Sequence, residues 1–250
     1  MGVTLITGAS SGIGRSLARR LARSGEPVAL LARRQALLDT LANEIESEGG
    51  RALPLACDVT ERTGVHEAVR RVEAALGPIE RLVANAGGSE PSLVDAFDAA
   101  QIERLFALNV LGVAHCIEAV LPGMLVRGAG HLVAMGSLAG RRGLPGSAAY
   151  GGAKAALTNL MESLRIDLAP RGIDVTLLLP GFVRSDPSRA SRHDPWLRME
   201  LEPATHLMQR AIEERRPRYA FPALLALALE IVALLPPRLA DRLLARALRP

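Results

Sequence analysis

The first twenty-five residues constrain the fold of this chain more than any other stretch. The apolar, β-branched run Val3–Thr7 predicts a buried strand, and residues 15–24 have a helical pattern that ends at Gly25. A glycine-rich turn, Thr7-Gly-Ala-Ser-Ser-Gly-Ile-Gly14, joins them. Glycine lets the backbone approach a diphosphate closely, and a helix N-terminus supplies free N–H groups, so this order predicts a phosphate cradle. A tight strand–helix turn without a ligand is the alternative.

The same strand-then-helix order continues through most of the chain. Alternation of this kind implies parallel strands joined by right-handed crossovers, with helices on both faces of the sheet. We therefore expect an α/β fold, a Rossmann-like doubly wound parallel sheet of about seven strands, built as a single domain over residues 1–250. The expected strands are 3–7, 28–32, 52–56, 81–84, 131–134, 175–179 and 218–221, and the expected helices are 15–24, 35–48, 61–76, 100–127 and 150–169.

Composition narrows the classes of function. The chain has 250 residues, 49% of them hydrophobic, and a formal net charge of +4. Its arginines are scattered and no aromatic run lies among them, so we expect no nucleic-acid partner. Cys57 and Cys116 lie far apart in apolar segments, which predicts free buried thiols in a reducing compartment. The N-terminus shows no signal-peptide pattern, so we expect a cytoplasmic protein, and we expect no metal site.

One lysine stands out in a chain that otherwise uses arginine. Lys154 is the only lysine, and it follows Tyr150, one of only two tyrosines, by four positions. Residues four apart lie on one face of a helix, so a phenol and a lone ammonium group would be neighbours. A compact charge that can release a proton suits a relay, and arginine cannot replace it. The alternative is an isolated surface lysine.

Two arginines follow the second predicted strand. Dinucleotide-binding folds that take NAD usually carry Asp or Glu there, whereas arginine suits the 2′-phosphate of NADP. Arg33 and Arg34 occupy these positions, and no acidic residue follows before Asp39. The sequence therefore favours NADP, with NAD as the less favoured cofactor. The alternative is that both arginines are a solvated helix start.

Together these motifs resemble the short-chain dehydrogenase/reductase family, from residue 3 to about residue 185. The resemblance implies a nicotinamide cofactor and a catalytic tetrad of Asn109, Ser137, Tyr150 and Lys154. Ser185 stands where the family usually has Thr, which keeps the hydroxyl group. The cofactor-binding residues that the resemblance implies, besides Tyr150, Lys154 and the two arginines, are Gly8, Ser10, Ser11, Gly12, Ile13, Gly14, Asp58, Val59, Asn85, Ala86, Gly87, Pro180, Gly181, Val183 and Ser185.

The chemistry of the tetrad follows from what carbonyl reduction needs, which is a hydride on carbon and a proton on oxygen. Tyr150 would donate that proton, and a neighbouring cation on Lys154 would lower its pKa. Lys154 would also bind the ribose hydroxyls. Ser137 would hold the substrate oxygen, and Asn109 would interrupt its helix and bind a water that links Lys154 to solvent. Taken alone, Ser137 is more often a loop cap and Asn109 a helix irregularity.

The last seventy residues depart from this regular pattern. Residues 182–216 are polar and weakly periodic, and the resemblance implies a substrate lid in which Trp196 and Met199 line the pocket; a helical hairpin packed on the body is the alternative. Residues 222–250 form a helical tail in which 223–235 carry only one charge, Glu230. A basic amphipathic helix follows, with Arg238, Arg242, Arg246 and Arg249 at helical spacing. Such helices bind membrane interfaces, but packing on the core or on a second subunit is equally open.

These patterns favour an NADPH-dependent reductase of a lipophilic ketone or aldehyde, or the reverse alcohol dehydrogenase, with peripheral membrane contact through 222–250. The family resemblance implies a homodimer or homotetramer. Two alternatives stay open. One is a 3-oxoacyl reductase acting on a carrier-bound thioester, which a basic surface would suit. The other is a non-catalytic nucleotide-sensing protein on the same fold.

Overall fold

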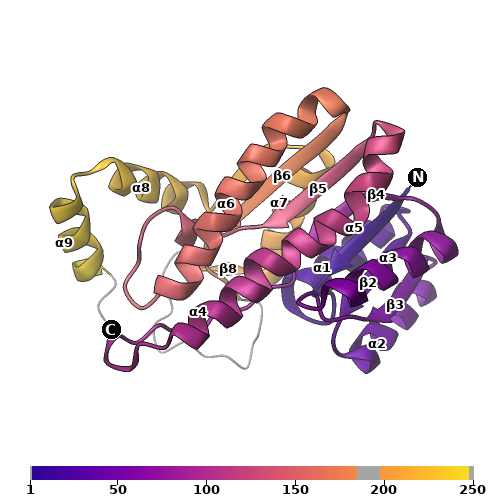
Figure 1. Ribbon diagram of the computed structural model, residues 1–250, viewed down its shortest axis with the longest axis horizontal. Helices are drawn as coiled ribbons and strands as arrows, with labels where there is room; N and C mark the ends of the chain where they lie inside the picture. The colour runs from indigo at the N-terminus through magenta and orange to yellow at the C-terminus, as the bar shows by residue number, and fades with distance from the viewer. Residues whose placement is uncertain (1, 185–197, 248–250) are drawn as a thin grey trace.

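The computed structural model describes residues 2–184 and 198–247, and its centre is a seven-stranded parallel sheet (Figure 1). The strand order is β3-β2-β1-β4-β5-β6-β9, and every neighbouring pair is parallel. The strands are β1 Val3–Thr7, β2 Val28–Ala32, β3 Ala52–Ala56, β4 Ile79–Ala84, β5 Gly130–Met135, β6 Ile173–Pro180 and β9 Arg218–Phe221. The chain reverses its direction of travel across the sheet between β1 and β4, and α/β sheets bind their ligands at such a point.

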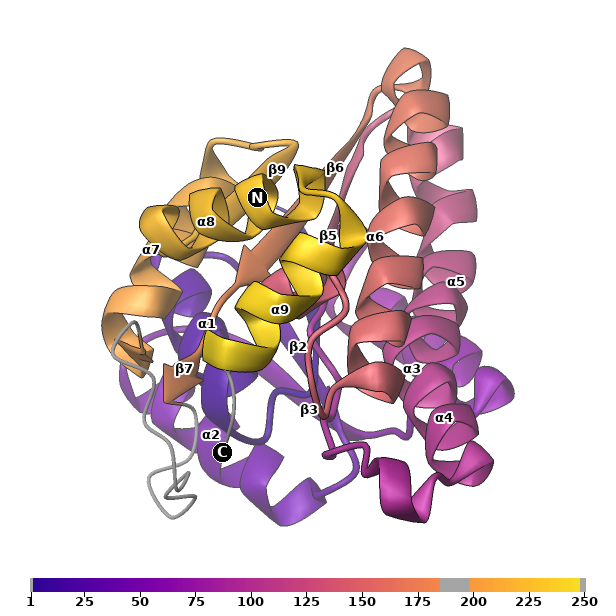
Figure 2. The ribbon, with the colours of Figure 1, turned by 90° about the vertical axis from the view of Figure 1, so that its left-hand side faces the viewer.

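Helices cover both faces of the sheet, as Figure 2 shows in an end-on view. One face packs on α1 Gly12–Arg23, α2 Gln35–Ser47 and α7 Leu201–Glu213. The other packs on α3 Arg62–Leu76, α5 Gly112–Arg127 and α6 Ala148–Leu168, with α4 Ala99–Phe106 running into α5. Strands buried on both sides explain the unbroken apolar runs of the sequence: all five residues of β1 are buried.

The expected fold class is therefore confirmed. Most element boundaries differ by one or two residues, but α1 begins at Gly12 rather than at residue 15, so the last glycines of the turn already belong to the helix. The polar segment 182–216 contains a regular helix, α7, and a short parallel pair of strands, β7 Val183–Arg184 and β8 Met199–Glu200. Cys57 and Cys116 are buried free thiols, as expected.

The C-terminal tail forms two helices, α8 Ala223–Leu234 and α9 Pro237–Ala247. Their inner residues belong to the same core cluster as β4, β5 and α6; these are Ala226, Leu229 and Leu244. Figure 2 shows α9 in front of the carboxyl ends of the central strands. The alternative that the tail packs on the core is thus correct for its inner face.

One continuous helical stretch, Ala99–Arg127, is long and apolar enough to cross a membrane by length and composition. It includes α4 and α5, which pack on the sheet and on α6. A long core helix of a globular protein passes the same test, and the inner residues of this stretch, among them Leu105, Ile117 and Met124, are buried in the core.

Candidate active site

The carboxyl ends of β1 and β4 are joined by side-chain hydrogen bonds. The Thr7 hydroxyl oxygen accepts from the main-chain N–H groups of Asn85, at 3.0 Å, and Ala86, at 2.9 Å. The Asn85 amide in turn donates to the carbonyl oxygen of Thr7 at 3.0 Å. These bonds fix the Asn85-Ala86-Gly87 motif beside the glycine-rich turn, at the point where the sheet changes direction.

The glycine-rich turn has the shape of a cradle. Gly8 has a φ of +66° and Gly12 of +54°, a left-handed conformation that favours glycine. A Cβ on Gly14 would lie 2.4 Å from the Gly8 carbonyl oxygen and 2.5 Å from the Asn85 amide nitrogen, so only glycine fits there. Ser11 precedes α1 without a side-chain cap, which leaves the N–H groups of the first helical turn available. The cradle therefore fits the diphosphate of a dinucleotide.

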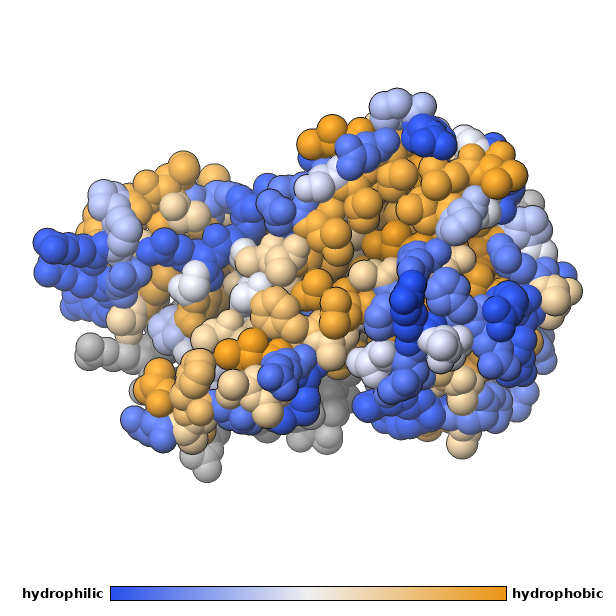
Figure 3. Space-filling view, in the orientation of Figure 1, coloured by the Kyte–Doolittle hydropathy of each residue, from blue (hydrophilic) through white to orange (hydrophobic). Residues whose placement is uncertain are grey.

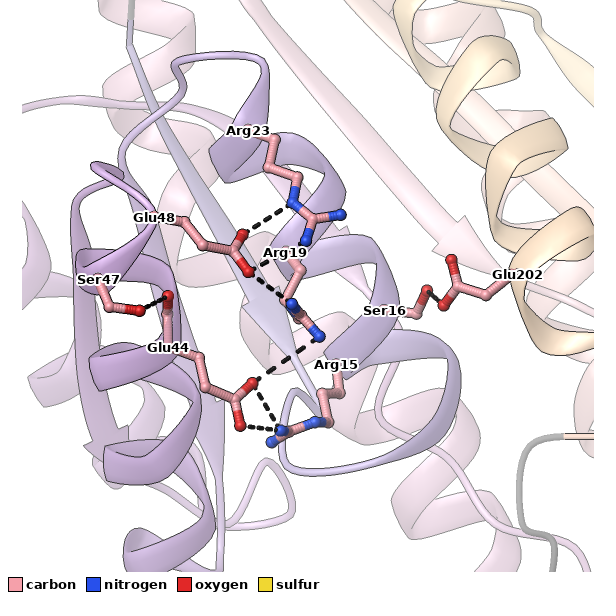
Figure 4. A network of polar contacts seen from close by, with 8 residues as sticks. All are labelled: Arg15, Ser16, Arg19, Arg23, Glu44, Ser47, Glu48 and Glu202. Carbon is pink, nitrogen blue, oxygen red and sulfur yellow. Dashed lines mark hydrogen bonds and ion pairs between the residues drawn. The ribbon is translucent and has the colours of Figure 1, made fainter.

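The carboxylates of Glu44, on α2, and of Glu48, just after α2, hold the helix that begins at this cradle. Arg15 of α1 contacts Glu44 at 2.6 Å, and Arg19 and Arg23 contact Glu48 at 2.6 and 2.8 Å (Figure 4). The two arginines hold the pKa of Glu48 at about 2. Rows of charges on facing helices thus align α1 with α2.

Arg33 and Arg34 take different positions. Arg34 donates to the hydroxyl oxygens of Ser10, at 2.9 Å, and Ser11, at 2.8 Å, so it braces the cradle from outside. The Arg33 side chain is 79% exposed and lies 3.9 Å from Asp58 Oδ2. Asp58 accepts at its other oxygen from the N–H and hydroxyl groups of Thr60. Arg33 and Asp58 therefore lie together beyond the ends of β2 and β3, with the arginine open to solvent.

Asn109 lies where the helix changes its geometry. Residues Ala107–Leu111 form a π-helical turn between α4 and α5. The Asn109 amide, fully buried, donates to the carbonyl oxygens of Leu105, at 2.9 Å, and Gly88, at 3.0 Å, and accepts from Gly88 N at 3.4 Å. The expected interruption of the helix at Asn109 is confirmed. The amide ties the interrupted helix to the loop after β4.

Lys154 is buried at the centre of the site. Its Nζ donates to the carbonyl oxygen of Met135, the last residue of β5, at 2.7 Å. Burial lowers the pKa of Lys154 to about 8. Lys154 Nζ and Asn109 Oδ1 both lie within 3.5 Å of the point where a Cβ on Gly87 would stand. The structure thus brings Gly87, Asn109 and Lys154 together from three separate elements.

Tyr150 and Lys154 are neighbours on one face of α6, as their spacing predicts. Lys154 Nζ lies 5.8 Å from the centroid of the Tyr150 ring. Burial raises the pKa of Tyr150, and a hydrogen bond with Ser137 opposes that rise. In the chain alone the pKa of Tyr150 is therefore raised and not lowered as expected, because burial outweighs the bond with Ser137. Ser137 also accepts from Ala139 N at 3.1 Å, so it caps its loop and contacts the tyrosine at once.

The remaining predicted residues lie around this centre, with three exceptions. Met199 is half-buried against the core cluster that contains α1 and α7. Val183 and Ile13 pack on the same cluster, so the place of Met199 in a substrate pocket stays a prediction. Ser185 and Trp196 lie outside the described residues. Pro180 ends β6, and beside it Gly181 N donates to Phe221 O at 2.7 Å. Ile13 and Val183 pack on the core. The carbonyl oxygen of Val59 contacts His115 Nδ1 at 3.0 Å.

Several residues of the site were not predicted from the sequence. Thr7 was assigned to the strand end and to the start of the glycine-rich turn, but the hydrogen bonds of its hydroxyl group to Asn85 and Ala86 were not predicted. Gly88 was not predicted to bind Asn109. Arg141 and Arg142, just after Ser137, contact the tail, and no local pattern indicates that. Within residues 2–184 and 198–247, no three His, Cys, Asp or Glu side chains gather in a way that could hold a metal ion.

Comparison with known proteins agrees with this geometry. The family model described as short chain dehydrogenase matches residues 2–196. An uncharacterized oxidoreductase of Myxococcus xanthus is 39% identical over 237 residues, which cover 95% of this chain and 94% of that protein.

Solved structures show the same architecture. A gluconate 5-dehydrogenase from Burkholderia cenocepacia, in complex with NADP and tartrate, is 30% identical with a TM-score of 0.78, over 84% of this chain and 87% of that one. A 7α-hydroxysteroid dehydrogenase complexed with NADH and 7-oxo glycochenodeoxycholic acid is 26% identical, again with a TM-score of 0.78, over 84% and 87% of the two chains. The chain thus belongs to the short-chain dehydrogenase family and is an NAD(P)-dependent oxidoreductase acting on CH–OH or carbonyl groups.

Proposed function

We propose that the protein is an NADPH-dependent reductase of a lipophilic ketone or aldehyde, able to run in reverse as an alcohol dehydrogenase. The observation that supports this best is the meeting of Ser137, Tyr150 and Lys154 beside the glycine cradle. A phenol hydrogen-bonded to a serine, next to a buried lysine, is the set of groups that protonating a carbonyl oxygen requires.

In the proposed mechanism the chain's own residues orient the carbonyl and supply the proton. Ser137 donates a hydrogen bond to the carbonyl oxygen and holds it against Tyr150. Tyr150 keeps its proton near neutral pH because burial raises its pKa, so it is the donor in reduction. Lys154 stabilises the phenolate that forms, through its charge one helical turn away. Its pKa of about 8 lets it pass a proton back to Tyr150.

The cofactor would lie along the carboxyl edge of the sheet. Its diphosphate fits the cradle of Gly8, Gly12 and Gly14, and its ribose hydroxyls would reach Lys154. When bound, it supplies the hydride that goes to the carbonyl carbon. Asn109 fixes the position of Gly87 in this site, because its amide is hydrogen-bonded to Gly88 in the same loop.

NADP is the proposed cofactor because of Arg33. Its side chain is largely exposed at the end of β2, where a 2′-phosphate would lie, and the carboxylate of Asp58 is 3.9 Å away. A pair at that distance leaves the guanidinium free to turn toward a phosphate. Arg34 is already engaged with Ser10 and Ser11, so we assign it to the shape of the cradle.

A lipophilic substrate is proposed from the tail. We treat residues 1–250 as one domain, in which 182–216 form the substrate lid and 222–250 the helical tail. The inner residues of α8 and α9 pack in the core, near the loop that follows Ser137. A site walled by helices this apolar favours a substrate with little charge.

The outer face of the tail carries the proposal of peripheral membrane contact. Leu224, Leu227, Ile231 and Leu234 of α8 are 53–87% exposed, at spacings of three and four residues. Beside them α9 exposes Leu239 and Leu243, with Arg238, Arg242 and Arg246 between. Leucines interleaved with arginines match a bilayer surface with anionic headgroups. We propose a cytoplasmic protein that binds such a surface through 222–250.

Vesicle co-sedimentation tests the membrane proposal. The full chain should bind vesicles that contain anionic lipid and should bind neutral vesicles less. Leu227→Ser combined with Ile231→Ser should reduce this binding. Leu37→Ser, on the far helix α2 and 38% exposed, is the matched control and should not. Equal binding by the two variants, or none by the wild type, contradicts the proposal.

A homodimer or homotetramer is proposed through the long helices. Figure 3 shows apolar residues gathered over α5 and α6 on one face of the molecule. Among the exposed ones are Leu111 at 53%, Val126 at 88% and Ile166 at 70%. An apolar face of this extent suits a second copy of the chain. Ile166→Arg should lower the mass measured by light scattering. A wild-type protein that already has the mass of a monomer would contradict the proposal.

Consumption of NADPH with carbonyls of graded chain length tests the function itself. We expect kcat/KM to rise with chain length, and to be lower with NADH than with NADPH. A preference for thioester-bound 3-oxoacyl groups on a carrier protein would favour the 3-oxoacyl reductase instead. Binding of NADPH without turnover of any carbonyl or alcohol would favour a nucleotide sensor.

A further inference from the structure

We propose that the tail is a wall of the active site, latched to the loop that carries Ser137, and that Glu230 is a positioning residue for the carbonyl substrate. This inference rests on the proposed function. The loop in question, residues 136–142, follows β5 and is called the serine loop below.

Two consecutive arginines at the end of the serine loop pair with acidic residues of the tail. Arg141 Nη2 donates to Glu230 Oε2 of α8 at 2.7 Å. Arg142 Nη2 donates to Asp241 Oδ1 of α9 at 3.0 Å. Each helix of the tail is thus tied to the loop by its own ion pair, across 89 and 99 positions of sequence. Because Arg141 lies only four residues after Ser137, a movement of the serine loop would also move these two arginines.

Glu230 joins three elements through one carboxylate. It is the only charged residue of the apolar stretch 223–235. One of its oxygens accepts from Arg141, and the other accepts from Arg218 of β9. Its pKa lies below the usual value of a glutamate, mainly because of the hydrogen bond from Arg141 and also because of Arg218, although burial acts in the opposite direction. The serine loop, the last strand and α8 therefore meet at Glu230.

Apolar contacts place the same helix on the motif after β6. A Cβ on Gly181 would lie 2.9 Å from Leu225 Cδ2 and 3.4 Å from Leu138 Cδ1. Leu225 belongs to α8 and Leu138 to the serine loop, so both leucines close over Gly181.

The ion pairs contribute little to stability, which points to a role in geometry. Arg141 and Glu230 are 24% and 37% exposed in their side chains, and pairs this open add a fraction of a kcal/mol. The Nε atom of Arg141 is buried and makes no hydrogen bond within the described part of the chain, which has a cost. What the pairs supply is direction: they fix where the serine loop stands relative to the tail, and so where Ser137 holds the substrate oxygen.

Kinetics of the full-length Glu230→Gln variant tests the latch. This change keeps the shape and removes the charge that Arg141 and Arg218 share. We expect KM for the best carbonyl of the series to rise, or its kcat to fall, by about tenfold, with KM for NADPH unchanged. Glu214→Gln is the matched control, because Glu214 pairs with Arg210 and Arg216 at the far end of α7. A carbonyl KM and kcat equal to the wild type, or an equal loss of NADPH affinity, overturns the inference.

The second pair, Arg142 with Asp241, allows the contact itself to be tested by exchanging its charges. Arg142→Asp and Asp241→Arg should each shift the carbonyl KM, and the double variant should restore it. Failure of the double variant to recover contradicts the pairing.

Hydrogen exchange separates this inference from the proposed function. The N–H groups of Gly140 and Arg141 bond within the serine loop, and they should exchange faster in Glu230→Gln than in the wild type and in Glu214→Gln. This readout needs no substrate. If the wild type reduces no carbonyl, the function fails while the latch is still measured; if exchange is unchanged, the latch fails.

Discussion

Lys154 Nζ lies 5.8 Å from the centroid of the Tyr150 ring on α6, where Lys154 is buried and Tyr150, one turn away, is half-buried. Burial acts on them in opposite directions, since it disfavours the charged form of each. It raises the pKa of Tyr150 and lowers that of Lys154 to about 8. Tyr150 therefore binds its proton more tightly than Lys154 does. This is the order that a relay from lysine to tyrosine needs, with the lysine able to release a proton near neutral pH.

The lowered pKa of Lys154 predicts how stability depends on pH. In the unfolded chain the lysine keeps its proton up to about pH 10.5, whereas in the folded chain it releases it near pH 8. Between these values the unfolded state binds more protons, so the free energy of unfolding rises with pH. Relative to Lys154→Met, the wild type should gain on the order of 3 kcal/mol between pH 7.5 and 10.5. Urea denaturation of both proteins measures this, and a constant difference would contradict it.

Asn109→Ala should both destabilise the protein and impair catalysis. The change leaves the carbonyl oxygens of Gly88 and Leu105 without their donor inside the core, at a cost on the order of 2–4 kcal/mol. It also frees the loop on which Gly87 stands. Asn159→Ala, at an exposed position of α6, is the control, and its free energy of unfolding should stay within about 0.5 kcal/mol of the wild type. Thermal and chemical denaturation compare the two, and equal stabilities would count against the role given to Asn109.

Arg33→Ala should change cofactor choice more than overall activity. Removing the exposed guanidinium should lower kcat/KM for NADPH by about tenfold or more, the value of a charge-assisted hydrogen bond, and leave NADH nearly unaffected. Arg34→Ala should weaken both cofactors alike, because it releases Ser10 and Ser11. Arg71→Ala, exposed on α3, is the control for net charge. Equal losses with the two cofactors in Arg33→Ala would remove the basis for preferring NADP.

The sequence predicted the sheet and the centre of the site because both depend on local patterns. Apolar runs of five residues between helical segments located the strands, and most motif residues fall at a strand end or in the first turns of a helix. Asn109 was expected to interrupt its helix, and it lies in a π-turn. These features are decided within a few residues along the chain.

Contacts between distant segments could not be predicted in this way. Arg141 and Glu230 are 89 positions apart, and nothing near either residue indicates the other. The pairing of β7 with β8, which joins Val183 to Met199, likewise had no local signal. The lowering of the Tyr150 pKa was inferred from the charges of Lys154 and of an oxidised nicotinamide ring, whereas the burial that raises it depends on the whole fold.

The measurement that tests the central claim most directly is kcat for NADPH-dependent carbonyl reduction by Tyr150→Phe beside Tyr219→Phe. The chain has only these two tyrosines, and Tyr219 lies in β9, where its ring contacts Phe221 and Arg216. Loss of the proton donor should lower kcat of Tyr150→Phe by about 100-fold or more, while Tyr219→Phe keeps the wild-type rate. A Tyr150→Phe enzyme that reduces its carbonyl at the wild-type rate would contradict the account.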